Sequence, residues 1–240
     1  MGIGSVNSRE VNVNSAKQLR IIAIGAHLDD IEIACGGTLA KALAAGHEVK
    51  MIVLSDSAYT NYDGGVIRTE EEAIREGRDA ALSLGVEDLE IHNFPSKDIP
   101  GDSVVVEFLN SRLDEFNPDL ILTHWTFDTH KSHRNTALST IAAGRYHTSI
   151  LMYEPFPPGG RSWVAFRPQY YVDITAHIEK KLEALRAHKS QYIHYGGECW
   201  IEAVKARALF RGFDLIKREG NGTKYAESYE VLRLGIDFLG

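Results

Sequence analysis

Short apolar runs alternate with longer amphipathic segments along the first two thirds of the chain. The apolar runs are rich in Ile, Leu and Val and are bounded by Gly, Pro, Asn or Asp, which is typical of buried strands. The pattern predicts strands over 19–26, 48–56, 88–95 and 119–125, and helices over 37–47, 67–85, 102–117 and 133–147. Strands and helices that alternate at this spacing imply an α/β fold with a mainly parallel sheet flanked by helices.

Single residues mark the ends of two of these helices. Gly85 follows the last periodic position of the helix over 67–85 and is expected to end it. Asp102 is a candidate N-cap for the helix over 102–117, because a short acidic side chain accepts hydrogen bonds from the first free backbone amides. Pro118 then prevents that helix from continuing.

The last third of the chain has a different pattern. It predicts strands over 150–156, 169–175 and 224–235, helices over 176–192 and 199–213, and a turn-rich loop over 157–168. No linker separates this part from the rest. We therefore expect a flexible leader over 1–17 and one α/β domain over 18–240, in which about 150–240 form a cap packed on the edge where the parallel strands end.

Composition and charge narrow the class of protein. The chain has 240 residues, of which 44% are hydrophobic and 25% charged, as in ordinary globular proteins. The net charge of −7 and the lack of a Lys/Arg-rich block argue against a nucleic-acid partner. No apolar run approaches the roughly 18 residues of a membrane span. The two cysteines, Cys35 and Cys199, form no disulfide framework, which favours the cytoplasm.

Polar clusters follow three of the predicted strands. His27, Asp29 and Asp30 come directly after the first strand, and 55–63 and 124–133 follow the second and fourth. Ligands of open parallel sheets bind at the carboxyl ends of the strands, where these three clusters meet. The sequence therefore predicts a functional site at that edge.

The residue types in these clusters suit a metal-dependent hydrolase. Imidazole and carboxylate groups bind zinc, and a catalytic zinc typically has three protein ligands and one open position for water. Two adjacent Asp residues in a turn are also common as a helix cap, and the paired imidazoles of His130 and His133 also suit a solvated helix face. The occurrence of both clusters after separate strands favours the metal site.

Two segments, GAHLDDIEIACGGTLA and THWTFDTHKSHRNTA, resemble the signature blocks of the PIG-L/LmbE-like family of zinc-dependent N-deacetylases. The first is similar to the family pattern A-H-x-D-D-x-E followed by G-G-T, and the second to D-x-H-x-D-H. The resemblance spans roughly residues 20–191. It implies a Rossmann-like fold without dinucleotide binding, in agreement with the absence of G-x-G-x-x-G after the first strand.

Carried over position by position, the resemblance implies that His27, Asp30 and His133 bind one Zn²⁺, or another divalent metal. It implies Asp29 as the general base, and His130 as the residue that, as an imidazolium, stabilises the oxyanion or helps to protonate the leaving amine. The implied reaction removes an N-acetyl group from an amino sugar or an amino-sugar conjugate. Similar proteins include homo-oligomers.

The second block departs from the family pattern at Ser132, where the family has Asp. Loss of a carboxylate beside His130 would make its imidazole harder to protonate. Asp128, two residues before His130, is a candidate to compensate for that charge. The first block has Leu28 where the family often has Pro, and we expect little effect from this change.

Arg68, at the start of the helix over 67–85, is a candidate contact for sugar hydroxyls or a phosphate. The alternative is a surface ion pair with Glu71 or Glu72.

Two other functions are consistent with the same residues. Carboxylates and imidazoles also serve metal-dependent phosphoesterases, although the sequence shows few further ligands for a second metal. A non-catalytic sugar-binding relative is the other alternative, and the presence of Asp29 with all three candidate ligands argues against it. The absence of H-E-x-x-H argues against a zincin peptidase.

Overall fold

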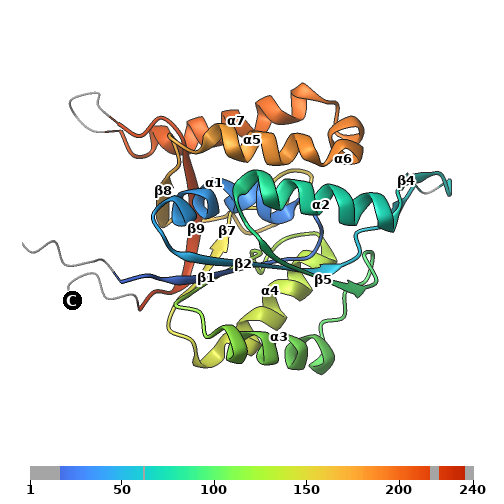
Figure 1. The fold of residues 1–240 in the computed structure, drawn as a ribbon, viewed down its shortest axis with the longest axis horizontal. Coiled ribbons are helices and arrows are strands. Elements are labelled where there is room, and N and C mark those ends of the chain that lie inside the picture. The colour runs from blue at the N-terminus through green and yellow to red at the C-terminus, as the bar shows by residue number, and fades with distance from the viewer. Residues whose placement is uncertain (1–16, 62, 217–221, 236–240) are drawn as a thin grey trace, which may run out of the picture.

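A seven-stranded sheet is the centre of the computed structural model, which describes residues 17–61, 63–216 and 222–235 (Figure 1). Its strands are β1 (Arg20–Gly25), β2 (Glu48–Ser55), β5 (Asp88–Phe94), β6 (Leu120–Thr123), β7 (Ile150–Tyr153), β8 (Tyr170–Asp173) and β9 (Ala226–Arg233). The strand order is β5-β2-β1-β6-β7-β9-β8. The pairs from β5 to β7 are parallel, and β9 is antiparallel to both β7 and β8. The predicted mainly parallel sheet is therefore confirmed. The predicted leader over 1–17, apart from Lys17, lies outside the described residues.

Helices cover both faces of this sheet (Figure 1). They are α1 (Asp30–Ala44), α2 (Glu70–Leu84), α3 (Ser103–Phe116), α4 (Lys131–Ala143), the 3₁₀ helix η1 (Gly144–Tyr146), α5 (Ile178–Ala187), α6 (Lys189–His194) and α7 (Glu198–Phe213). α1 and α2 lie on one face and α3 and α4 on the other. Alternate residues of β1 enter two separate cores: Ile21 packs on the α1 side and Ile22 on the α3 side. None of the helices in the described ranges is long and apolar enough to cross a membrane.

The predicted helix ends are confirmed at Gly85 and Asp102. Gly85 adopts the left-handed conformation at the end of α2, with φ 91°, and the Asp102 side chain accepts a hydrogen bond from the Val104 amide. The predicted start of the first helix at residue 37 is wrong, because α1 begins at Asp30. Gly37 lies inside this helix, and a Cβ there would come within 2.7 Å of Ile174. The glycine thus permits close packing and does not begin the helix.

The expected cap over the strand-end edge needs correction. β7, β8 and β9 extend the central sheet, and α5 and α7 form a further layer outside α1 and α2 (Figure 1). β7 is fully buried and pairs with β6, so it belongs to the core. α5 and α7 bury a third hydrophobic cluster that includes Ile178 and Trp200. Near the strand-end edge, α6 makes contacts with the β3–β4 hairpin (Tyr59–Thr60 and Val66–Arg68).

A buried ion pair joins this outer layer to the sheet. Lys181 of α5 lies 2.5 Å from the Glu227 carboxylate of β9, and both side chains are 3% exposed. Glu227 also accepts hydrogen bonds from the backbone amides of Gly37 and Thr38 in α1. One carboxylate therefore connects α1, α5 and β9.

Replacement of Lys181 by Met is expected to lower the free energy of unfolding by about 3 kcal/mol, because it leaves a buried carboxylate without its counter-charge. Urea unfolding measures the change. The matched control is Lys205→Met, which removes an exposed ion pair with Glu179 and is expected to cost at most about 1 kcal/mol. Equal losses in the two variants would contradict a special role for the buried pair.

Candidate functional site

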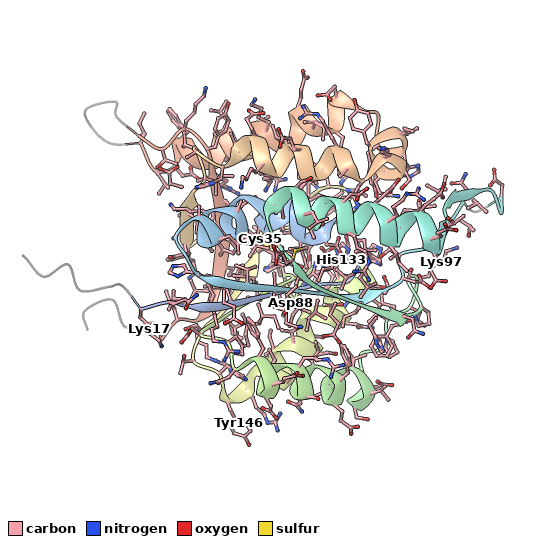
Figure 2. The ribbon with its side chains drawn as sticks, viewed as in Figure 1. Lys17, Cys35, Asp88, Lys97, His133 and Tyr146 are labelled. Carbon is pink, nitrogen blue, oxygen red and sulfur yellow. The ribbon has the colours of Figure 1, made fainter. Side chains whose placement is uncertain are left out.

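The residues predicted for the site come together at the carboxyl ends of β1 and β6. These strands are parallel neighbours, so the turn after Gly25 and the segment after Thr123 lie at the same edge of the sheet. Figure 2 shows His133 toward the end of the molecule that also holds Lys97, away from Lys17. The predicted convergence of the clusters after the first and fourth strands is therefore found.

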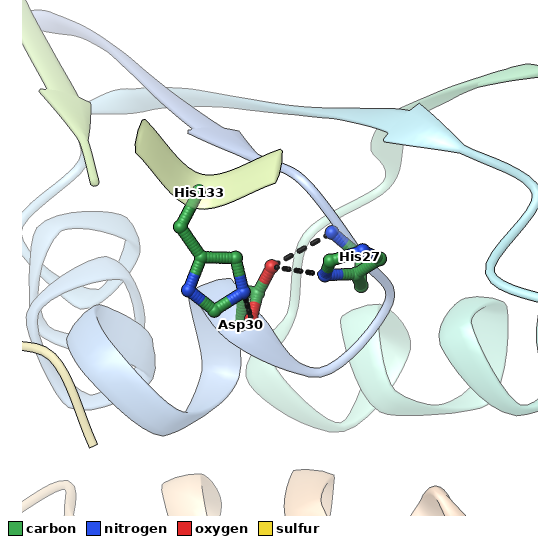
Figure 3. A group of neighbouring side chains, drawn as sticks. All are labelled: His27, Asp30 and His133. Atoms are coloured by element: carbon green, nitrogen blue, oxygen red, sulfur yellow. Dashed lines mark hydrogen bonds and ion pairs between the residues drawn. The ribbon is translucent and has the colours of Figure 1, made fainter. Parts of the chain in front are cut away.

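Asp30 is the centre of this group (Figure 3). Its Oδ2 lies 3.3 Å from His27 Nδ1, and its Oδ1 lies 3.2 Å from His133 Nε2. One nitrogen of each histidine and one oxygen of Asp30 lie within 4.8 Å of one another. Two imidazoles and a carboxylate are a donor set that suits a divalent metal and leaves a coordination position for water.

The second nitrogen of each histidine is held by another group. His27 Nε2 lies 2.9 Å from the Ser96 carbonyl oxygen, and His133 Nδ1 lies 3.0 Å from Asp128 Oδ2. Metal-binding histidines usually donate their other N–H to a carbonyl or carboxylate in this way, which fixes the orientation of the ring. Burial alone would lower the pKa of His133, but the carboxylates of Asp30 and Asp128 raise it to about 10. The group thus favours a positive charge, as a metal site must.

Asp128 contacts both the candidate ligand His133 and the segment that carries His130. Its side chain is 1% exposed and also accepts hydrogen bonds from the backbone amides of His130 and Gly160. Burial would raise the pKa of Asp128, but the hydrogen bond from His133 and these amides lower it to about 2. Asp128 is therefore a carboxylate under all ordinary conditions.

The substitution Asp128→Asn is expected to weaken metal binding about 10- to 100-fold, because it removes the charge that orients and polarises His133. Competition with a chelating dye measures the affinity. The matched control is Asp98→Asn, which changes an exposed carboxylate paired with Lys131 and should leave the affinity unchanged. An unchanged metal affinity in Asp128→Asn would contradict this role.

Asp29 occupies an unusual backbone conformation beside the candidate ligands. Its φ of 139° is rare for a residue with a side chain, and such strain occurs mostly at functional sites. The residue is nearly buried, at 7% exposed. Burial, together with the neighbouring charge of Asp30, raises the pKa of Asp29 to about 6. A carboxyl group with such a pKa can both accept and return a proton near neutral pH.

Arg68 holds the turn that carries Asp29. Its guanidinium donates to the Leu28 carbonyl at 3.1 and 3.2 Å and to the Ser57 carbonyl at 3.1 Å. The side chain is 3% exposed, so it does not form the surface ion pair considered as an alternative. The Leu28 amide in turn donates to Ser57 Oγ at 2.8 Å. A contact between Arg68 and a substrate stays a prediction.

His130 lies at the open side of the group. It is exposed, precedes α4, and stacks on the ring of His133 with 4.2 Å between centroids. Burial of part of the ring, with the nearby His133 and His27, lowers the pKa of His130 to about 4. His130 is therefore accessible from solvent, and the low pKa does not favour the imidazolium expected from the family resemblance.

Ser132 makes its side-chain hydrogen bond to the loop that contains Ser96. Its hydroxyl donates to the Ser96 carbonyl at 3.1 Å, and no hydrogen bond joins it to His130 among the described residues. It therefore supports the carbonyl that orients His27. Asp128 compensates only in part for the carboxylate missing at position 132, because it accepts a hydrogen bond from the backbone amide of His130 and does not bind its ring.

His124 is the site residue that sequence reasoning missed. It is 3% exposed, and its Nε2 lies 3.2 Å from Asp30 Oδ2. Its ring stacks on His133 at 4.1 Å, and together with Asp128 and His133 it makes a second His/Asp group within 4.8 Å. The sequence did offer one indication that His124 belongs to the site: it directly follows β6, as the turn with His27 directly follows β1. Burial, with the neighbouring His133, lowers the pKa of His124 to about 4.

Proteins of known activity resemble this chain over most of its length. A diacetylchitobiose deacetylase from Thermococcus kodakarensis is 27% identical over 223 residues, which are 87% of this chain and 81% of the relative. An N,N'-diacetylchitobiose deacetylase from Pyrococcus horikoshii, solved with its inhibitor MPG, superposes with a TM-score of 0.76 at 22% identity, covering 94% of this chain and 88% of that one.

A third similar protein shows that this fold serves more than one reaction. The 4-carboxy-2-hydroxymuconate hydratase from Pseudomonas putida KT2440 superposes with a TM-score of 0.74 at 19% identity, covering 92% of this chain and 98% of that one. At such identities the structures share the fold alone with this chain, and a fold does not by itself establish the reaction.

The family match covers the part of the chain that carries the site. The PIG-L family, described as GlcNAc-PI de-N-acetylase, matches residues 22–143, more than half of the chain. This range runs from β1 to the end of α4 and includes every candidate ligand. The chain therefore belongs to the PIG-L family.

Proposed function

We propose that this protein is a zinc-dependent hydrolase that removes an N-acetyl group from an amino sugar or an amino-sugar conjugate. The observation that carries the proposal is the convergence of His27, Asp30 and His133, with the strained Asp29 beside them. The activities of the chitobiose deacetylases support the choice of substrate class.

The donor set fits the metal that the family implies. His27 through Nδ1, His133 through Nε2 and one Asp30 oxygen would hold it, because the second nitrogens of the two histidines are already engaged by Ser96 and Asp128. A bound zinc ion supplies Lewis acidity, which lowers the pKa of a water ligand to about 7 and polarises the amide carbonyl.

Residues of the protein then carry out the proton transfers. Asp29 accepts a proton from the attacking water as the oxygen bonds to the carbonyl carbon, and it returns that proton to the amine as the C–N bond breaks. His130, on the open side and in its neutral form, would donate a hydrogen bond to the oxygen that becomes negative in the transition state. The products are acetate and a free amino sugar.

The proposed activity is tested by measuring free amine released from a panel of N-acetylated sugars, with and without a chelator. We expect release from at least one sugar, its loss on chelation, and its recovery with about one zinc per chain. Hydrolysis of p-nitrophenyl phosphate with no amine release would instead support a phosphoesterase, and sugar binding without release would support a non-catalytic relative.

The arrangement of ligands argues against the phosphoesterase. Two-metal sites hold their ions about 3.5–4 Å apart and need two sets of ligands. Here the two His/Asp groups share His133, so the described residues do not offer two separate sets. A metal content near two per chain would contradict this conclusion.

A further inference from the structure

A second group of aromatic side chains lies at the same edge of the sheet and has no part in the chemistry described above. Tyr59 of β3 and His194 of α6 meet with 3.3 Å between the hydroxyl and Nε2, and their rings are 5.5 Å apart. The His194 ring is 5.0 Å from that of Tyr195, which in turn packs 5.5 Å from Trp200. We refer to Tyr59, His194 and Tyr195 as the aromatic wall.

The hairpin side of the wall is tied to the turn that carries the general base. Tyr59 pairs with Arg68 across the β3–β4 hairpin. The Arg68 guanidinium binds the carbonyl of Leu28, the residue before Asp29. The position of Tyr59 is therefore coupled to that of Asp29 through a short series of contacts.

The helical side of the wall is tied to α1. At the start of α6, His188 Nε2 lies 3.1 Å from Glu32 Oε1, and both side chains are almost fully buried. The Ser190 hydroxyl and amide donate to Glu76 of α2. Figure 1 shows α6 and the β3–β4 hairpin toward the same end of the molecule. Two segments that are far apart in the sequence are thus anchored on the helices that flank the site.

The charges of the two Asp residues of the site act on Tyr195. Burial raises its pKa well above the ordinary value, and the negative charges of Asp29 and Asp30 add to this shift. The residue is nevertheless 40% exposed, so it is accessible to a ligand. Carboxylates dominate its charged surroundings, which favours an uncharged ligand over a phosphate.

The chemistry of the wall fits a sugar ring. Tyrosine and histidine present flat apolar faces with polar atoms at the edge. A pyranose has the complementary shape, with an apolar C–H face and hydroxyls around its rim. Ligand sites typically combine aromatic surfaces with a few polar groups in this manner.

We propose that the aromatic wall is the subsite for the pyranose ring that carries the N-acetyl group. The inference rests on the proposed deacetylase function and names the part of the site that distinguishes cyclic sugar amides from acyclic ones. Tyr195 and His194 pack on the ring, and Tyr59 aligns His194 through its hydrogen bond.

Steady-state kinetics of the zinc-loaded enzyme test this subsite. In Tyr195→Ala, the preference in kcat/KM for N-acetylglucosamine over acyclic N-acetylethanolamine is expected to fall about tenfold, mainly through KM. Tyr195→Phe should retain most of the preference, because it keeps the ring. Tyr59→Ala, on the other side of the wall, should lower it as well. The matched control is Tyr146→Ala, a tyrosine 84% exposed on η1 (Figure 2), which should leave the preference unchanged.

Calorimetric titration with glucosamine separates this proposal from the proposed function. Glucosamine carries no N-acetyl group, so its binding requires no turnover. We expect its Kd to rise about tenfold in Tyr195→Ala. An unchanged Kd would overturn the subsite, whether or not the enzyme hydrolyses N-acetylated sugars. Equal losses of kcat/KM for the cyclic and acyclic substrates would also overturn it.

Discussion

Replacement of Asp29 by Asn is expected to lower turnover by a factor of about 100 to 10,000 while the zinc content stays near one per chain. Asparagine has nearly the same shape but cannot accept the proton of the attacking water. The side chain of Asp29 is not among the three groups that converge on the metal position, so metal binding should persist. The variant therefore separates proton transfer from metal binding.

Turnover of an N-acetylated sugar and zinc content by elemental analysis are measured on the same preparation of Asp29→Asn. The control is Glu71→Gln, which removes an exposed carboxylate from the first turn of α2 and should change neither quantity. Near-wild-type turnover would show that Asp29 is not the base. Loss of zinc would show that the strained turn serves mainly to hold the metal.

Replacement of His133 by Ala is expected to remove most of the zinc and, with it, nearly all of the activity. The change leaves His27 and Asp30 as the remaining ligands of the group, fewer than the three that catalytic zinc sites usually have. It also leaves the buried Asp128 carboxylate without its imidazole partner. Both effects weaken the binding of the metal.

Elemental analysis after dialysis against micromolar zinc checks the His133→Ala prediction, and circular dichroism checks that the protein is folded. The control is His147→Ala, which removes an imidazole from the residue after η1 and should retain one zinc per chain. Undiminished zinc in folded His133→Ala would contradict the assignment of the ligands.

The elements of the fold were largely predictable because they depend on near neighbours in the chain. The buried runs of β1, β2 and β6, the left-handed Gly85 and the cap at Asp102 follow from local periodicity and backbone preference. The start of α1 was not predictable in this way. Its two consecutive glycines resemble a helix boundary, and only the contact with Ile174 explains Gly37 inside the helix.

The meeting of the two polar clusters was predictable from the sequence, and the family resemblance named the candidate ligands within them. His27, Asp30 and His133 follow predicted strands, and the parallel sheet requires their segments to meet. The contacts that other residues make with these candidate ligands were not predictable. Ser96, which binds both His27 and Ser132 through its carbonyl, belongs to a loop with no distinctive pattern. The sequence places His124 at the end of a strand, but only its contacts with Asp30 and His133 show that it belongs to the site.

Local pattern and residue chemistry thus specify the strands, the helices and the His/Asp groups of this protein, because each depends on a few residues close in sequence. The order of β7, β9 and β8 depends on pairings between distant segments, which periodicity does not encode. The same holds for the buried position of Arg68 and for the meeting of Tyr59 with His194. Side-chain environment is a property of the packed molecule, and only the tertiary structure supplies it.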